Sequence, residues 1–177
     1  PVDSASTWGW VSGPAGTSWL DAELPLPRDG FRIATGTAAA GLDGFRRSHL
    51  EALRAQTIAA AGSADAAVTR FAEVATLAVL TDDRDALARF VADQLGELAA
   101  GGEREQRLRT TVRNYLDGGA NVRAVARDLN YHRNTIQHRL DLAARLRGRP
   151  LEDDRSGLAL ALQVAEHYGA AVLRPQG

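Results

Sequence analysis

Positions 121–140 read Asn-Val-Arg-Ala-Val-Ala-Arg-Asp-Leu-Asn-Tyr-His-Arg-Asn-Thr-Ile-Gln-His-Arg-Leu, and this stretch decides the fold of the C-terminal part of the chain. Asn121 is a favourable N-cap, because its side-chain oxygen can accept a backbone N–H of the first helical turn. Asn130 tolerates the left-handed backbone that ends a helix sharply. Between them the apolar residues recur at helical spacing, at Val122, Val125, Ala126 and Leu129. The pattern predicts a two-turn helix followed by a tight turn.

A second helix is predicted directly after that turn. His132 stands at its N-cap position, although His is a weaker cap than Ser or Asn, and we expect Tyr131 to be a buried anchor. At about 100° per residue, the apolar and polar side chains of this helix separate onto opposite faces. The inward set is Ile136, Leu140 and Ala143, and the outward set is Asn134, Gln137, His138 and Asp141. Two such helices joined by a tight turn form a helix-turn-helix.

The outward side chains have the hydrogen-bonding chemistry of a base-reading surface. Asn and Gln can bridge the N6 and N7 groups of adenine, and Arg can bridge two acceptors of guanine. The first turns of the second helix of a helix-turn-helix enter the major groove. We therefore expect a recognition helix at about 133–146, with base contacts from Arg133, Asn134, Gln137 and His138. Phosphate contacts are expected from Arg123, Thr135 and Arg139. The pattern alone is equally compatible with an ordinary two-helix corner whose polar residues face solvent.

Positive charge is concentrated around this stretch. Residues 1–103 hold 8 Arg and 14 Asp or Glu, a net charge of −6, whereas residues 104–149 hold 11 Arg and 4 acidic residues, a net charge of +7. Residues 150–177 hold 2 Arg and 4 acidic residues, a net charge of −2, which brings the whole chain to −1. Neutralising DNA phosphates requires such a local excess and not a basic chain overall. The charge distribution therefore favours a DNA-binding surface over a plain helical corner.

Composition argues against several other classes of protein. The chain has no Cys, so we expect no disulfide framework, thiol nucleophile or Cys-ligated zinc. The 4 His residues form no metal-binding set, and the adjacent Ser48 and His49 face different ways on a helix, so they make no nucleophile–base pair. We expect no enzyme activity, no cofactor and no metal.

Other features of the composition bear on the origin of the chain. No apolar run is long enough to span a membrane and no signal peptide is visible, which predicts a cytoplasmic protein without a membrane partner. The absence of Lys together with abundant Arg, Ala and Gly indicates a GC-rich bacterial genome. The chain begins with Pro1 and has no Met, which predicts a fragment of a longer protein.

The first hundred residues are predicted to form an α+β unit. Strands are expected at 31–35 and 67–71 and helices at 43–61, 73–80 and 84–98, and the core candidates of the first helix are Phe45, Leu50, Leu53 and Ile58. Gly36 and Gly41 precede that helix, but Leu42-Asp43 follows where a phosphate-binding loop needs Lys and then Ser or Thr, so we expect only a tight turn. The break at Gly101-Gly102 predicts a first domain at 1–100 and a second at 101–177.

Two further helices complete the expected all-α C-terminal domain. The first runs from Glu103 to Leu116. Asp153 or Asp154 can cap the second, which reaches Tyr168. A helix that is apolar on more than one side is buried in a core or shared with a partner, and this one has Leu158, Leu160, Leu162 and Val164. The sequence leaves core packing and a dimer interface equally open.

Three segments of the C-terminal part carry a known family pattern. They read Leu-Arg-Thr-Thr-Val-Arg-Asn-Tyr-Leu at 108–116, Gly-Gly-Ala-Asn-Val-Arg-Ala-Val-Ala at 118–126 and His-Arg-Asn-Thr-Ile-Gln-His-Arg-Leu at 132–140. Over about residues 104–168 the chain resembles the helix-turn-helix domain of the PucR/CdaR family of bacterial transcriptional regulators. His138 stands where Tyr is common in that family. The resemblance implies a Fis-type helix-turn-helix.

Residues 1–100 are similar to the later part of the GGDEF-like domain that precedes the helix-turn-helix in these regulators. The similarity rests on Gly-Leu-Asp-Gly-Phe-Arg-Arg-Ser-His at 41–49, followed by Glu51-Ala52. It implies a degenerate domain without cyclase activity, of which the early part is missing from this chain. Gly101-Gly102-Glu103 lies between two helical stretches and is not a cyclase motif.

Residues and resemblance together predict a sequence-specific transcriptional regulator whose partner is double-stranded DNA. One helix-turn-helix covers few base pairs, so we expect a homodimer on a palindromic or repeated site. A small-molecule effector would act through a missing N-terminal region. The alternative hypothesis is an interaction module, in which the α+β part binds an effector or mediates dimerisation and the helical part does not bind DNA.

Overall fold

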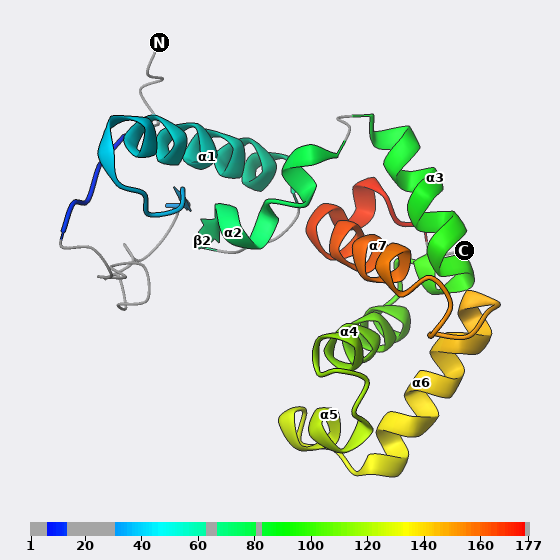
Figure 1. Cartoon of the computed structure of the whole chain (residues 1–177). Coiled ribbons are helices and arrows are strands. Elements are labelled where there is room, and N and C mark those ends of the chain that lie inside the picture. Colours follow the sequence, from blue (N-terminus) through cyan, green and yellow to red (C-terminus); the bar gives the residue numbers. More distant parts are fainter. Residues whose placement is uncertain (1–6, 14–30, 63–66, 81–82, 176–177) are drawn as a thin grey trace. The chain divides into compact units, whose positions relative to one another are not determined.

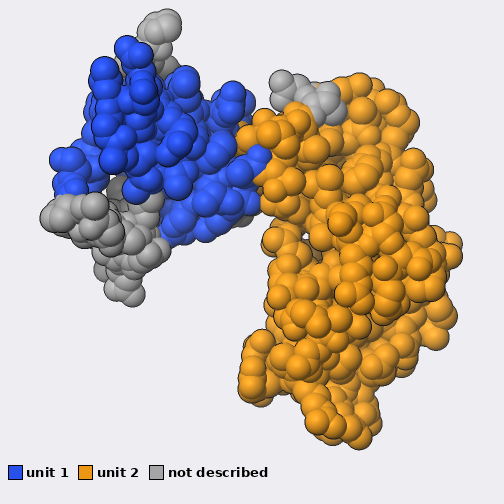
Figure 2. Space-filling model, viewed as in Figure 1, with its two compact units in different colours: residues 1–57, 66–75 blue, residues 58–65, 76–177 orange. Residues whose placement is uncertain are grey.

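A computed structural model gives the fold of the chain and describes residues 7–13, 31–62, 67–80 and 83–175 (Figure 1). The chain divides into two compact units. Unit 1 comprises residues 1–57 and 66–75, and unit 2 comprises residues 58–65 and 76–177 (Figure 2). No helix among the described residues is long and apolar enough to cross a lipid bilayer.

Unit 1 is built around one long helix and a small parallel sheet. Strand β1 (Ile33–Thr35) precedes helix α1 (Gly41–Ala61), and strand β2 (Val68–Arg70) follows it. The two strands pair in parallel, with Ile33 opposite Val68 and Thr35 opposite Arg70. The predicted order of strand, helix and strand is confirmed, and each strand is shorter than expected.

The buried face of α1 differs from the face that was predicted from its large apolar residues. Ala55 and Ile58 are buried, at 0% and 7% exposure, whereas Phe45 and Leu50 are 47% and 57% exposed. Phe45 and Leu50 lie about 110° around the helix from the Ala55–Ile58 face, at 100° per residue. The prediction of Phe45 and Leu50 as core residues is therefore wrong, and the ring of Phe45 stacks on that of Trp10 instead, with centroids 5.4 Å apart.

The segment between β1 and α1 is the tight turn that was expected. A Cβ atom at Gly36 would lie 2.0 Å from the carbonyl oxygen of Ser48, so only glycine allows the chain to pass this close to α1. Gly41 has a φ of 74°, a conformation that glycine adopts without steric strain. Glu51 accepts the backbone N–H of Thr37 at 2.8 Å. The close approach to Ser48 accounts for Gly36, and the positive φ accounts for Gly41.

The segment predicted as one helix at 73–80 is divided in two. Helix α2 (Phe71–Val74) is a single turn, and a short 3-10 helix, η1 (Leu77–Val79), follows it. The backbone becomes extended at Leu80, with a ψ of 164°. The expected helix is therefore wrong in its length and continuity.

In the described part of unit 2 the regular elements are helices, apart from an isolated bridge between Ala100 and Arg174. Its main elements are α3 (Arg84–Leu95), the 3-10 helix η2 (Gly96–Ala99), α4 (Glu103–Asp117), α5 (Val122–Asp128), α6 (Arg133–Arg147), α7 (Arg155–Tyr168) and the 3-10 helix η3 (Gly169–Ala171). Helix α7 packs on α3 and α4, and α6 packs on α4, α5 and η2 (Figure 1). The fully buried side chains Leu95, Val112, Ile136 and Leu158 come from four different helices of this core.

The break at Gly101-Gly102 separates α3 and η2 from α4 without dividing two compact units. Residues 84–99 pack on α6 and α7 and belong to unit 2. Such long-range packing cannot be read from a local glycine pair. The division into a first domain at 1–100 and a second at 101–177 stays a prediction.

Helix α7 is covered within the chain itself. Leu158, Val164 and Leu162 are 0%, 0% and 3% exposed, and Leu160 is half-buried. Its N-cap is Asp154, whose carboxylate accepts the backbone N–H of Gly157 at 3.0 Å, as the sequence predicted. Packing on α3 and α4 accounts for most of the apolar surface of this helix, so core packing explains its composition.

Candidate nucleic-acid interface

The turn between α5 and α6 is held by a cap and by backbone hydrogen bonds. At the start of α5, Oδ1 of Asn121 accepts the backbone N–H of Arg123 at 3.0 Å. At its end Asn130 has a φ of 53°, and the backbone N–H of Tyr131 donates to the carbonyl oxygen of Ala126 at 2.8 Å. The predicted cap and the predicted left-handed residue are both confirmed.

Helix α6 begins with the histidine cap that the sequence indicated. Nδ1 of His132 accepts the backbone N–H of Asn134 at 3.2 Å, so a ring nitrogen replaces the oxygen of the usual capping residues. Nδ1 accepts this hydrogen bond through its lone pair. The cap holds the start of α6 in place next to the tight turn between α5 and α6.

The inner face of α6 is locked into the core of unit 2. Ile136, Leu140 and Ala143 are 0%, 4% and 0% exposed, as expected from their spacing. Ala126 of α5 is 6% exposed and lies in the contact between α5 and α6. A small side chain at this position lets the two helix axes approach closely. Helix α6 is thus held by packing on one side, and its other side is exposed to solvent.

The outer face of α6 carries the predicted base-contacting residues. All four side chains expected to contact bases are exposed, and they are Arg133, Asn134, Gln137 and His138. Thr135 is also exposed, and Arg139 is half-buried. Six of the seven predicted site residues therefore lie within two turns at the N-terminal end of one helix, and Arg123 is exposed in the first turn of α5.

Two further residues share this outer face. Asp141 is exposed and accepts a hydrogen bond from Nε2 of Gln137 at 2.9 Å. Arg145 is exposed as well, and the sequence reasoning did not include it in the site. Asn134, His138, Asp141 and Arg145 are spaced i, i+4, i+7 and i+11, which places them on one stripe of the helix. That spacing was the signal that could have identified Arg145.

The expectation of a buried anchor at Tyr131 is wrong. Its side chain is 46% exposed, and the guanidinium carbon of Arg139 lies 4.1 Å from the centre of its ring. Hydrogen bonding to Arg139, followed by the positive charge of the same group, lowers the pKa of the Tyr131 phenol. The ring therefore contacts a side chain of α6 and does not enter the core.

Not all of the positive charge in residues 104–149 is available to a ligand. Arg109 and Arg147 are 9% and 5% exposed. Arg109 donates to the carbonyl oxygens of Leu98 and Ala100, both at 2.7 Å. Burial lowers the pKa of the Arg109 guanidinium. This guanidinium therefore joins η2 to α4 and does not face solvent.

Arg147 has the same structural role at the C-terminal end of α6. Its guanidinium donates to the carbonyl oxygens of Gln94 at 3.0 Å and Asp153 at 2.9 Å, and also to that of Pro150. Burial lowers the pKa of this group, and the charge of neighbouring Arg149 lowers it further. These hydrogen bonds fasten the end of α6 to α3 and to the segment that leads into α7.

Several other arginines of the positive block are paired with acidic side chains. Arg107 bonds Glu103 at 3.4 Å and Arg127 bonds Asp128 at 3.3 Å. In the described part of the chain, no acidic side chain lies within 4.0 Å of Arg123, Arg133 or Arg145. Among the arginines of residues 104–149, those available to an anionic ligand thus lie on α5 and α6.

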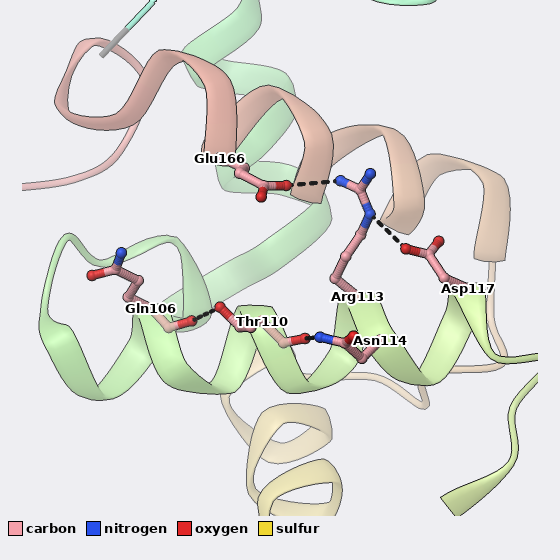
Figure 3. Close-up of polar contacts among 6 residues, drawn as sticks. All are labelled: Gln106, Thr110, Arg113, Asn114, Asp117 and Glu166. Carbon is pink, nitrogen blue, oxygen red and sulfur yellow. Dashed lines mark hydrogen bonds and ion pairs between the residues drawn. The ribbon is translucent and has the colours of Figure 1, made fainter. Parts of the chain in front are cut away.

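Two hollows open on the surface of unit 2. One has a volume of about 530 Å³ and runs beside α6, where Gln137, Asp141 and Arg145 line it. The other, about 600 Å³, lies between α4 and α7. In Figure 3, Arg113 at this second hollow bonds Asp117 at 3.0 Å and Glu166 at 2.9 Å. Its charge is therefore used to join α4 to α7.

Comparison with known families identifies the same segment as the geometry. Residues 108–165 match the family model described as the PucR C-terminal helix-turn-helix domain. The match begins in α4 and ends in α7, so it includes α5, α6 and the turn between them. No curated protein matches the chain. The chain thus carries a helix-turn-helix domain similar to that of PucR-type regulators, and this points to a regulatory role in DNA binding rather than to catalysis.

Proposed function

We propose that this chain binds double-stranded DNA in a sequence-specific manner, as the DNA-binding part of a transcriptional regulator of the PucR/CdaR type. The observation that carries the proposal is the division of α6 into two faces. Its inner face is locked in the core through Ile136 and Ala143, and its outer face presents exposed groups that can donate and accept hydrogen bonds. A rigid helix with such a face is what reading a major groove requires.

Each predicted residue has a distinct role in this proposal. Asn134 and Gln137 read adenine, and Arg133 reads guanine, because these side chains can form two hydrogen bonds with one base. His138 contacts the base edge one turn further along. Thr135 and Arg139 bind the phosphates on the flank of α6, and Arg123 binds them from the start of α5. Arg145 joins this set as an additional phosphate contact at the far end of the same stripe.

The hydrogen bond between Gln137 and Asp141 bears on the specificity of the site. Because Asp141 accepts one N–H of the Gln137 amide, the second N–H and the amide oxygen remain for a base. One donor and one acceptor are what adenine N7 and N6 need. Asp141 also places a negative charge on the outer face, so unspecific attraction to phosphate is weaker there.

The assembly and the N-terminal unit belong to the same proposal. Two copies would bind two half-sites one helical turn apart, about 34–36 Å, because one recognition helix contacts only a few base pairs. Residues 1–100 would be the later part of a GGDEF-like domain that relays an effector signal from a region outside this chain. The parallel β1–α1–β2 unit and the resemblance over residues 41–52 support this assignment.

Selection of the full chain on a randomised duplex library, with sequencing at two salt concentrations, tests the proposal. An enriched symmetric motif is the expected result, and its half-site spacing gives the geometry of the dimer. A matched pair of variants locates the interface. Arg133→Ala should weaken binding, whereas Arg89→Ala removes the same charge from an exposed position on α3 and should not. Absence of binding at either salt concentration would favour an interaction module that does not bind DNA.

A further inference from the structure

An exposed aromatic ring lies at the corner of the proposed DNA-binding surface. Tyr131 is 46% exposed, although it occupies the tight turn between two packed helices. Its backbone is held, because its N–H donates to the carbonyl oxygen of Ala126 at 2.8 Å and the preceding Asn130 is left-handed. A ring on a fixed backbone has only two side-chain torsions to restrict. Tyr131 is therefore a rigid platform at the N-terminal end of α6.

The guanidinium of Arg139 rests on this platform. Its central carbon lies 4.1 Å from the ring centre, within the range of a cation–π contact. Helical side chains lean toward the N-terminus, so the stack draws Arg139 toward the end of α6 that would enter the groove. No carboxylate of the described residues lies within 4.0 Å of Arg139.

A stacked guanidinium remains able to bind an anion. The guanidinium lies over the ring of Tyr131 and hydrogen-bonds its phenol. A guanidinium has five N–H donors, so others remain for an anion. Arg139 is about 100° around the helix from its neighbour His138, which places it on the flank of α6. The flanks of a helix in the major groove meet the sugar–phosphate backbone, whereas its centre meets the bases.

We propose that Tyr131 is a positioning residue that holds the Arg139 guanidinium against a DNA phosphate at the edge of the major groove. This inference rests on the proposed function, since it assigns a role within the same DNA-binding surface. Without the ring, Arg139 keeps its charge but samples many more rotamers. Binding to phosphate must then restrict those rotamers, which weakens affinity for every sequence alike.

A double-mutant cycle on the full chain tests the positioning role. Affinity for one duplex is measured for the wild type, Tyr131→Ala, Arg139→Ala and the double variant, over a series of salt concentrations. Tyr131→Ala should weaken binding about two- to fivefold in the wild type and should have no effect once Arg139 is absent. Arg139→Ala should reduce the slope of log affinity against log salt by about 0.9, the value for one lost phosphate contact.

Two further variants separate positioning from packing. Tyr131→Phe keeps the ring face and should retain most of the affinity, whereas Tyr131→Leu keeps an apolar side chain without a ring and should behave like Tyr131→Ala. Because the Tyr131 side chain is not part of the core, the melting temperatures of Tyr131→Phe, Tyr131→Leu and Tyr131→Ala should stay close to that of the wild type. The positioning role would be overturned if Tyr131→Leu bound DNA as tightly as the wild type. It would also be overturned if Tyr131→Ala weakened binding equally with and without Arg139.

A measurement without DNA distinguishes failure of this inference from failure of the proposed function. Ultraviolet titration of the phenols should show that Arg139→Ala raises the pKa of one tyrosine, the one absent in Tyr131→Phe, because the neighbouring guanidinium lowers it in the wild type. A pKa that does not change would disprove the stacked pair itself. A changed pKa in a chain that binds no duplex at low salt would disprove the proposed function and, with it, the role of the pair at phosphate.

Discussion

The two ends of α6 use the same residue types for opposite purposes. At the C-terminal end, Arg147 is 5% exposed and donates to carbonyl oxygens of α3 and of the segment that leads into α7. At the N-terminal end, Arg133 is exposed and has no acidic partner within 4.0 Å among the described residues. The comparison shows that a cluster of arginines in a sequence combines structural and ligand-binding groups. Only burial and hydrogen-bond partners separate them.

The difference between its two ends also explains how α6 can be rigid and still expose polar groups to a ligand. Arg147 and the buried Ile136 hold α6 against α3, α4 and α5, which fixes the direction of its outer face. The polar groups of the first two turns then have few partners within the chain. Because α6 is anchored at one end and along one face, its backbone is already ordered before a ligand binds at the other end. Binding there carries no further entropic cost for ordering the helix.

Replacing the buried arginine should have the largest effect. Arg147→Ala leaves the carbonyl oxygens of Gln94 and Asp153 without their donor and opens a cavity, so the free energy of unfolding should fall by about 2–4 kcal/mol. Urea denaturation of the full chain measures this. The matched control is Arg145→Ala, an exposed arginine two residues earlier, which should change stability by less than about 0.5 kcal/mol. If Arg147→Ala and Arg145→Ala lowered the free energy of unfolding equally, Arg147 would have no special structural role at the C-terminal end of α6.

A change at the exposed end should affect recognition and leave stability nearly unchanged. Asn134→Ala should reduce discrimination at one base pair by about 1–3 kcal/mol, because one bidentate contact to a base is lost. Its melting temperature should stay close to that of the wild type. Binding to a set of duplexes that differ at single base pairs measures the discrimination. An unchanged base preference would show that Asn134 does not read DNA.

The cap of α5 should have an intermediate effect on stability. In Asn121→Ala the backbone N–H of Arg123 loses its acceptor, and the free energy of unfolding should fall by about 1 kcal/mol. Asn121→Ser keeps an oxygen at the cap and should recover most of the loss. If both substitutions were neutral in urea denaturation, the hydrogen bond at this cap would contribute nothing to the fold.

The smallest expected effect is that of a phosphate contact outside α6. Arg123→Ala should weaken binding to all sequences alike and reduce the salt slope by about 0.9, because the side chain binds phosphate without reading a base. Arg89→Ala, which removes the same charge from α3, is the control and should leave the slope unchanged. A loss of base preference in Arg123→Ala would contradict the assignment to phosphate.

Sequence reasoning succeeded where a feature depends on neighbours along the chain. The caps at Asn121, His132 and Asp154 and the left-handed Asn130 follow from local backbone chemistry, and the buried spacing of Ile136, Leu140 and Ala143 follows from helical geometry. The match to a helix-turn-helix family covers the same residues. These parts of the site could be predicted because each is determined within a few residues.

The errors concern features that depend on residues far away in the sequence. Tyr131 was expected to be buried, yet the corner of the core is already filled and the ring stacks on Arg139. The charge count could not show that Arg109 and Arg147 are buried, since their acceptors lie up to 53 residues away. The packing of α3 on α7 brings residues 84–99 into unit 2, which a local glycine pair could not indicate, and the division into domains at 1–100 and 101–177 stays a prediction.

Backbone amide spectra of the ¹⁵N-labelled chain, recorded during titration with a duplex, test most directly whether the N-terminal end of α6 binds DNA. The largest chemical-shift changes are expected at residues 132–139 and around Arg123, while Arg147 and the helices α3 and α7 should change little. Shifts concentrated on α4 and α7, with residues 132–139 unchanged, would show that DNA contacts another face of unit 2 and not the N-terminal end of α6.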